Sequence, residues 1–205
     1  MASLSIGRLP KTHIVRDFLD RDTHARILAE SIENEAAYGP SRVSRYDGGK
    51  LVDCVLNPKS RVASSRKLST GLAEQFTRAI FERRDEIAKA THTAYPAKPA
   101  IEIEAVHSGD GAFFKTHIDT IQGKASVHRV ISAVYYFSRQ PKGFMGGELR
   151  IWSLDRTSSV TIEPEDNAII FFSSIVPHEV LPVSVPSGAF EDGRFSINCW
   201  INRAS

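Results

Sequence analysis

From residue 101 onward the chain consists of short apolar runs separated by turn-forming residues, and this pattern limits the possible folds more than any other feature. The runs are rich in Val, Ile, Phe and Tyr, and no convincing helical period lies between them. Strands at such spacing build two packed antiparallel sheets or a barrel. The eight predicted strands are 101–106, 112–117, 129–137, 148–154, 159–162, 168–172, 178–183 and 194–201.

Residues 1–99 show a mixed pattern in which helical periods alternate with polar loops. Residues 20–35 predict a helix, which Asp22 or Thr23 can cap at its start. Residues 65–89 predict a second, longer helix with one apolar face. The other predicted elements are two strands at 13–18 and 51–56 and a loop at 36–50.

These patterns predict a single domain over residues 1–205, of α+β class and mainly β. Residues 1–99 are expected to form a mostly helical buttress, and residues 100–205 a jelly-roll core. A chain of 205 residues can bury a sizeable core without disulfide bonds. The core is therefore expected to depend on apolar packing alone.

Composition excludes several classes of protein. The 26 basic and 24 acidic residues give a net charge of only +2, which is too small an excess to indicate nucleic acid as a partner. No apolar run is long enough to span a membrane, and the first residues show no signal-peptide pattern. The two cysteines, Cys54 and Cys199, lie far apart and read as reduced thiols. A cytoplasmic protein is expected.

A candidate metal site begins with His117 and Asp119. In a strand, residues two apart point to the same side, so both side chains can reach one point in space. An imidazole nitrogen and a carboxylate are both good metal ligands. This spacing arises often by chance, however, and alone it favours an exposed polar loop.

A second histidine strengthens the hypothesis. His178 opens a later predicted strand directly after the apolar run 168–172, and a late strand of a jelly roll can lie beside an early one. Two histidines and one carboxylate form the facial triad of non-haem ferrous oxygenases, which leaves positions on the iron open. A zinc site with the same three ligands is the alternative chemistry.

Arg194 and Ser196 discriminate between these alternatives. On one strand they share a face, and a guanidinium beside a hydroxyl suits a carboxylate, because the planar fork binds both oxygens. An isolated strand arginine is usually a surface residue. Next to a facial triad, Arg194 is interpreted as the anchor for the distal carboxylate of 2-oxoglutarate.

With these residues in place, the chain resembles the iron(II)- and 2-oxoglutarate-dependent dioxygenases, and specifically their prolyl 4-hydroxylase-like branch. The resemblance covers residues from about 107 to 201, nearly half the chain, and rests on the order and spacing of its motifs. These motifs are His117-x-Asp119, Tyr135-Tyr136, Gly146-Gly147-Glu148-Leu149, Pro164, Phe171-Phe172-Ser173, Pro177-His178-Glu179-Val180, Pro182-Val183, Arg194-x-Ser196 and Trp200-Ile201.

The resemblance implies a double-stranded β-helix, a form of jelly roll, with Fe(II), 2-oxoglutarate and O2 as cofactors and cosubstrates. It implies that Tyr136 binds the far carboxylate of 2-oxoglutarate alongside Arg194. His107 stands where this branch often has a tyrosine near the cosubstrate, so it is expected to line the same pocket. Related halogenases carry a small residue in place of the carboxylate, so Asp119 favours hydroxylation of a C–H bond, with release of succinate and CO2.

The substrate is not encoded in the metal motif. The segments expected to shape its pocket are 41–50, 120–128 and 138–147, and the arginines available for a substrate carboxylate are Arg42, Arg45, Arg61, Arg66 and Arg150. An amino acid or an amino-acid-derived small molecule is the preferred substrate class. A peptidyl side chain, such as proline, and a non-catalytic cupin-like module that binds metal remain the alternatives.

Overall fold

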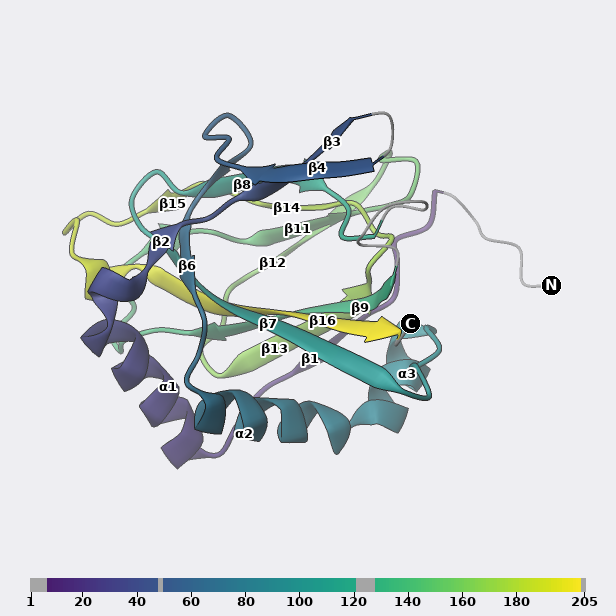
Figure 1. Ribbon diagram of the computed structural model, residues 1–205, viewed down its shortest axis with the longest axis horizontal. Coiled ribbons are helices and arrows are strands. Elements are labelled where there is room, and N and C mark those ends of the chain that lie inside the picture. The colour runs from purple at the N-terminus through teal and green to yellow at the C-terminus, as the bar shows by residue number, and fades with distance from the viewer. Residues whose placement is uncertain (1–6, 48–49, 121–127, 204–205) are drawn as a thin grey trace.

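The computed structural model describes residues 7–47, 50–120 and 128–203, without the side chains of residues 44–53. Two antiparallel sheets face each other, and three α-helices lie on the outer side of the larger sheet (Figure 1). Among the described residues, no helix is long and apolar enough to cross a membrane.

The larger sheet has seven strands in the order β1-β13-β9-β16-β7-β6-β2. In that order their bounds are Thr12–Val15, Ala168–Ser173, Arg129–Phe137, Arg194–Arg203, Pro99–Ser108, Ser64–Arg66 and Gly39–Pro40. Ten-residue β16 is central, because β9 and β7 both pair with it.

The smaller sheet has five strands in the order β12-β11-β14-β8-β5. In that order their bounds are Ser159–Ile162, Leu149–Trp152, His178–Val180, Phe113–His117 and Arg61–Val62. Two short pairs complete the described strands: β10 (Met145–Gly146) with β15 (Val183–Ser184), and β3 (Val43–Asp47) with β4 (Lys50–Val55). The arrangement is the predicted double-stranded β-helix of a mainly β, α+β chain.

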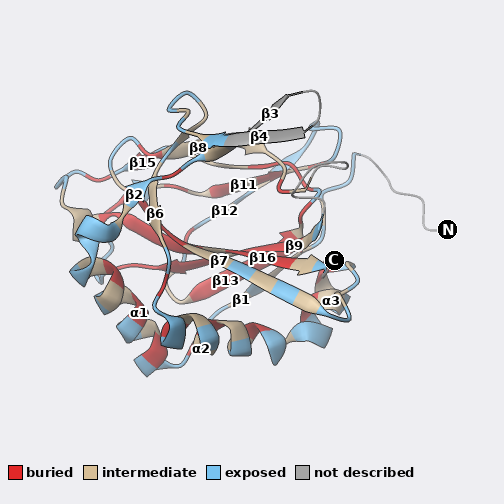
Figure 2. Ribbon diagram, viewed as in Figure 1, coloured by how far each residue is buried: buried red, intermediate tan, exposed pale blue. Residues whose placement is uncertain are grey.

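Three helices cover the larger sheet: α1 (Arg21–Glu33), α2 (Thr70–Phe81) and α3 (Arg84–Thr91). Asp20 caps α1, because its side chain accepts a hydrogen bond from the Thr23 N–H at 2.9 Å. Figure 2 shows that the outer faces of these helices are exposed while the sheet beneath them is buried. The main core therefore lies between the helices and the larger sheet.

An aromatic cluster forms the centre of this core. Phe76 of α2 is fully buried, with its ring centroid 5.6 Å from that of Phe18 and 5.5 Å from that of Tyr135. Tyr135 belongs to β9, so the contact joins helix and sheet. A second, smaller core between the two sheets contains Tyr136, Leu149 and Phe172.

The structure differs from the sequence prediction in residues 36–89. The predicted helix 65–89 is two helices, because Arg83 leaves helical geometry, and its first residues belong to strand β6. The predicted loop 36–50 contains β2 and β3. The missed strands β2, β5 and β6 have two or three residues each and few apolar side chains, so they carry no alternating apolar pattern.

Phe76→Ala should destabilise the fold by about 3–5 kcal/mol, because it leaves a cavity that its aromatic neighbours cannot fill. Chemical denaturation followed by circular dichroism measures the change. Phe81 of the same helix is exposed, so Phe81→Ala is the matched control and should stay within about 0.5 kcal/mol of the parent. Equal losses in both variants would contradict the core described here.

Candidate metal and anion site

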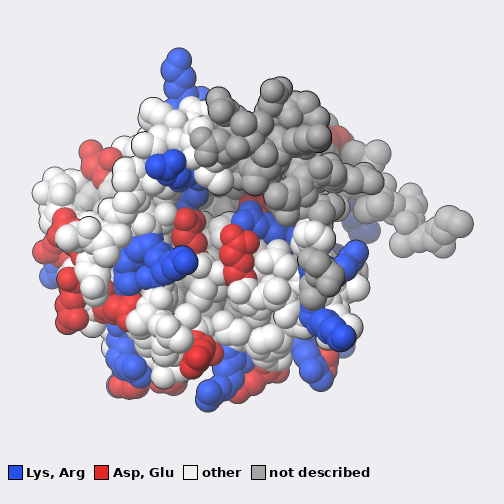
Figure 3. Space-filling view, viewed as in Figure 1, with Lys and Arg blue, Asp and Glu red and all other residues white. Residues whose placement is uncertain are grey.

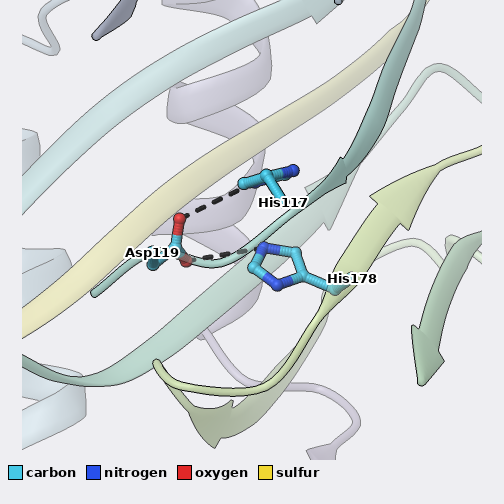
Figure 4. A group of neighbouring side chains, drawn as sticks. All are labelled: His117, Asp119 and His178. Atoms are coloured by element: carbon cyan, nitrogen blue, oxygen red, sulfur yellow. Dashed lines mark ion pairs between the residues drawn. The ribbon is translucent and has the colours of Figure 1, made fainter. Parts of the chain in front are cut away.

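Strand pairing brings the three predicted metal-binding side chains together. His117 is the last residue of β8 and His178 the first residue of β14, and the two are directly opposite in the antiparallel pair. Asp119 follows β8 by two residues. One ligand atom from each side chain lies within 4.8 Å of the others, and both imidazoles point toward the carboxylate (Figure 4).

Backbone carbonyls orient both imidazoles. Nδ1 of His117 lies 2.9 Å from the Lys115 carbonyl oxygen, and Nδ1 of His178 lies 2.9 Å from the Val176 carbonyl oxygen. Since a carbonyl oxygen only accepts, we assign the ring proton to Nδ1 in both histidines. Each Nε2 then offers a lone pair to a metal, 3.7 Å and 3.5 Å respectively from an oxygen of Asp119.

Aromatic rings support the same two imidazoles. Phe114 stacks on His117 with a centroid separation of 3.6 Å, and Phe172 meets His178 edge to face at 4.8 Å. The Arg61 guanidinium lies 5.0 Å from the centroid of Phe114. Because these contacts restrict ring rotation, the donor atoms are held in place before any metal binds.

Two buried serines hold Asp119. Ser132 donates a hydrogen bond to its Oδ2 at 2.6 Å, and the hydroxyl oxygens of Ser132 and Ser174 are 2.8 Å apart. The backbone N–H of Asp119 also donates to the Ser174 carbonyl at 3.1 Å. Neither serine was a sequence prediction, because a single Ser in an apolar strand gives no signal of what it faces.

Electrostatics favour the metal-binding protonation states. Burial, together with the neighbouring His178, lowers the pKa of His117 to about 3, against the opposing effect of Asp119. Burial by itself would raise the pKa of Asp119, but His178 and His117 outweigh it and lower that pKa overall. A neutral imidazole and an ionised carboxylate are the forms that ligate metals.

A buried arginine lies in the same pocket. Arg194 is 2% exposed and forms no ion pair with any described acidic residue. Its Nη1 donates to Ser196 Oγ at 3.4 Å, while its Nε and Nη2 and the Tyr136 hydroxyl have no hydrogen-bond partner among the described residues. The guanidinium lies 4.8 Å from the centre of the Tyr136 ring. Burial lowers the pKa of Arg194 and raises that of Tyr136.

An unpaired buried guanidinium is costly, so this arrangement calls for an anion. Arg194, which lines the pocket, has two guanidinium nitrogens without a partner among the described residues, and the adjacent Tyr136 phenol also has none, which suits a carboxylate. Gly147 makes room for the arginine, because a Cβ there would lie 2.5 Å from Arg194 Cδ. The Gly146-Gly147 pair is visible in the sequence, but the sequence alone does not show that Gly147 leaves space for Arg194.

The structure does not bring His107 into the pocket, so that prediction is corrected. Strand β7 runs to Ser108, beyond the predicted end at 106, and its alternation turns His107 toward the helices. There its ring stacks on Phe190 at 3.9 Å, and its Nε2 lies 2.9 Å from the Phe190 carbonyl oxygen. Val106 and Ser108, on the other side of the strand, line the pocket.

The predicted substrate segments contribute unequally. Residues 121–127, and the side chains of residues 44–50, lie outside the described residues, which leaves Arg45 and most of two segments untested. Segment 138–147 supplies none of the described residues that line the pocket or the cleft beside it. Arg150 points elsewhere and pairs with Glu179 at 3.1 Å.

Fold and site together define a class of protein: a double-stranded β-helix that holds two histidines and one carboxylate next to a buried anion site. Residues 103–202 match the family model of the 2OG-Fe(II) oxygenase superfamily. The match covers just under half of the chain, and over these residues the chain is similar to that superfamily. The matched family implies Fe(II), 2-oxoglutarate and O2, and the cluster of His117, Asp119 and His178 fits iron.

Known proteins similar to this chain agree with that family. An uncharacterized PKHD-type hydroxylase of Synechocystis sp. is 29% identical over 204 residues, which are 95% of this chain and 64% of the relative. The chain thus spans less than two thirds of that relative.

Solved structures share the fold. A Pseudomonas putida prolyl-4-hydroxylase superposes with a TM-score of 0.69 at 23% identity, over 96% of this chain and 94% of that one. A Trichoplax adhaerens prolyl hydroxylase, solved with a peptide fragment of hypoxia inducible factor, superposes with a TM-score of 0.68 at 15% identity, over 97% and 84%.

Ser132→Ala should weaken metal binding by about 10- to 100-fold, because Asp119 loses the hydroxyl that fixes its carboxylate. Calorimetric titration with Mn(II) under anaerobic conditions measures the affinity. Ser31→Ala is the control, since Ser31 is equally buried on α1 and its hydroxyl has no hydrogen-bond partner among the described residues. Unchanged Mn(II) affinity in Ser132→Ala would show that the serine does not position this carboxylate.

Proposed function

We propose that this chain is a 2-oxoglutarate-dependent dioxygenase that hydroxylates an unactivated C–H bond of an amino-acid-type substrate, with release of succinate and CO2. The single observation that carries the proposal is the buried, unpaired Arg194 in the same pocket as the His117, Asp119 and His178 cluster. A metal site of another kind would not need an anion anchor beside it.

The three side chains fit iron(II). Two neutral imidazole nitrogens and one carboxylate oxygen within 4.8 Å of one another are the donor set of a facial triad. The same donors also bind zinc, and the chemistry of the anion pocket is what favours iron here. In this proposal His117, Asp119 and His178 are the catalytic metal ligands, and iron with O2 supplies the oxidising power.

Arg194, Ser196 and Tyr136 are the proposed anchor for the distal carboxylate of 2-oxoglutarate. Arg194 would donate its free Nε–H and Nη2–H, and the Tyr136 hydroxyl would donate a third hydrogen bond. The cosubstrate would thereby satisfy buried donors that have no partner among the described residues. Ser196 would keep the guanidinium aligned through its contact with Nη1.

The rest of the pocket would keep water from the reacting groups. Apolar side chains from both sheets line it beside the polar anchor, which favours reaction in a dry, shaped cavity. They are Val106, Phe113, Val134, Leu149 and Val180. The proposed third ligand, Asp119, is a carboxylate where related halogenases carry a small residue. A carboxylate at this position favours hydroxyl transfer over halide transfer.

The size of the substrate distinguishes two candidate functions. The sequence favours a small molecule such as an amino acid or its derivative. One observation favours a peptidyl side chain: a cleft of about 910 Å³ opens beside the metal site, which is more room than a single amino acid fills. The peptide-bound Trichoplax relative has the same fold.

We also propose that residues 1–205 act as one domain in the cytoplasm. Strand β1 pairs with β13 of the larger sheet, and α1–α3 share their core with it, which supports a single folding unit. Both cysteines are unbridged: Cys54 is exposed and Cys199 is buried, where burial raises its pKa. Reduced thiols suit a reducing compartment.

Arg194→Met should abolish detectable 2-oxoglutarate binding or weaken it on the order of a hundredfold, because at least two charge-assisted hydrogen bonds are lost. Binding is measured by calorimetry on the Mn(II)-loaded protein, and Mn(II) affinity itself should stay unchanged. Arg203→Met is the matched control, on the same strand but exposed. Equal 2-oxoglutarate binding in Arg194→Met and the parent would remove Arg194 from the proposed anchor.

Iron-loaded protein should convert labelled 2-oxoglutarate to succinate, and His178→Ala should not, because it lacks one of three ligands. Mass spectrometry of the same reactions with pools of amino acids and of peptides should find a gain of one oxygen atom in one pool. The pool that gains oxygen identifies the substrate class. Absence of succinate from the wild-type protein in every pool would count against the dioxygenase.

A further inference from the structure

An open cleft adjoins the metal site. It shares Arg61, Phe114, His117, Asp119 and Trp200 with the inner pocket, so two of the three candidate metal ligands lie where the two spaces meet. Figure 3 shows that basic side chains gather on both sides of the hollow between the sheets, with acidic side chains between them. A substrate that reaches the metal ligands through this cleft passes these charges.

Basic residues outnumber acidic ones in this cleft. Apart from Asp119, its acidic residues among the described ones are Glu102 and Glu104. Its basic residues are Arg42, Arg61, Arg66, Lys67, Lys115, Arg129 and Arg156. The excess contrasts with the near neutrality of the whole chain, whose net charge is +2, so positive charge is concentrated here.

Two of the arginines are fixed in position by a carboxylate and an aromatic ring. Arg61 Nη2 donates to Glu104 at 3.3 Å while its guanidinium faces Phe114. On the other side, the Arg129 guanidinium lies 3.8 Å from the centroid of Trp200. The Arg129 Nη2 and Nε donate hydrogen bonds to the Glu102 carboxylate, at 2.8 Å and 3.3 Å respectively. These pairs neutralise both glutamates of the cleft.

Arg66 is held in the same way but keeps an unused donor. Its Nη2 donates to Glu30 at 2.8 Å, and its guanidinium lies 5.4 Å from the centroid of Tyr38. The side chain is 8% exposed, yet its Nε has no hydrogen-bond partner among the described residues. A buried, unpaired donor beside the cleft is a second and independent indication of an anionic ligand.

Four cations of the cleft remain uncompensated. Arg42, Lys67, Lys115 and Arg156 form no ion pair with any described acidic residue. They come from separate segments: before β3, after β6, within β8 and after β11. One small carboxylate cannot contact cations that are distributed over four segments, whereas an extended ligand with several carboxylates can.

We propose that this cleft binds a peptide segment with acidic side chains on both sides of the residue to be hydroxylated. The proposal rests on the proposed function, since it names the substrate class of that same site. The uncompensated cations attract the acidic side chains, and the oriented arginines fix the register. Phe114 and Trp200, beside the metal ligands, supply apolar walls for the target residue.

Three labelled octapeptides test the proposal without catalysis. They share a central Leu-Pro and carry on both sides Glu, Gln or Lys. Fluorescence anisotropy with the Mn(II)- and 2-oxoglutarate-loaded protein should give at least about tenfold tighter binding for the Glu peptide than for the Gln peptide, with no binding of the Lys peptide. The preference should shrink as salt rises, because exposed charges are screened. Equal binding of the Glu and Gln peptides would overturn the proposal.

Charge reversal separates the cleft from the charge of the whole protein. The variant Lys67→Glu/Lys115→Glu/Arg156→Glu should lose the preference for the Glu peptide. The matched control Arg21→Glu/Arg78→Glu/Lys89→Glu changes the net charge equally, on exposed helix positions without ion pairs, and should keep it. Equal losses in both variants would also overturn the proposal.

Two further arms identify the other possible ligands. Free glutamate competing as well as the Glu peptide would mean a small acidic substrate rather than a peptide. A cleft variant that loses only 2-oxoglutarate affinity would mean that the cations attract the cosubstrate. Either result contradicts the peptide assignment but leaves the dioxygenase intact. Failure of the parent protein to bind Mn(II) and 2-oxoglutarate would instead reject the proposed function.

Discussion

Strand β16 presents alternate residues to two different environments, and both the core and the candidate site depend on that alternation. Phe195 and Ile197 face the helices and are fully buried in the main core. Arg194 and Ser196 face the smaller sheet and line the pocket. A register shift of one residue would exchange the two sets, placing a guanidinium in the apolar core. The apolar face under the helices therefore fixes the position of the proposed anion anchor as firmly as any contact within the pocket.

The metal-binding cluster depends on a different constraint, the pairing of β14 with β8. That pairing sets His178 opposite His117, and the turn before β14 holds the third side chain as well. Within this turn the Val176 carbonyl orients His178, and Ser174 contacts both the backbone of Asp119 and the serine that binds its carboxylate. Two residues of one turn, Ser174 and Val176, thus organise two of the three side chains, so backbone geometry preorganises the cluster.

The sequence predicted which side chains share a face in the candidate cluster and in the proposed anchor, because those signals are local. His117 and Asp119 share a strand face by spacing alone, and so do Arg194 and Ser196. The prediction failed for His107 because the strand containing it is longer than its apolar pattern indicates, and the face of its last residues is set by pairing with β16. Ser132 and Ser174 could not be found, because their partner lies far away in the sequence and their residue type indicates no particular chemistry.

For the arginines of the cleft, the sequence predicted the residues but not the partners that orient them. From the sequence, Arg42, Arg61 and Arg66 are candidates for binding a substrate carboxylate. Without a structure, however, each of them is typical of a solvated surface charge. Two of them have ion-pair partners, Glu104 for Arg61 and Glu30 for Arg66, and both glutamates come from other elements of the fold. Such pairs hold a guanidinium rigid and therefore lower the entropy that an anionic ligand must overcome on binding. The fold converts Arg61 and Arg66 into oriented donors by placing a carboxylate and an aromatic ring beside each of them.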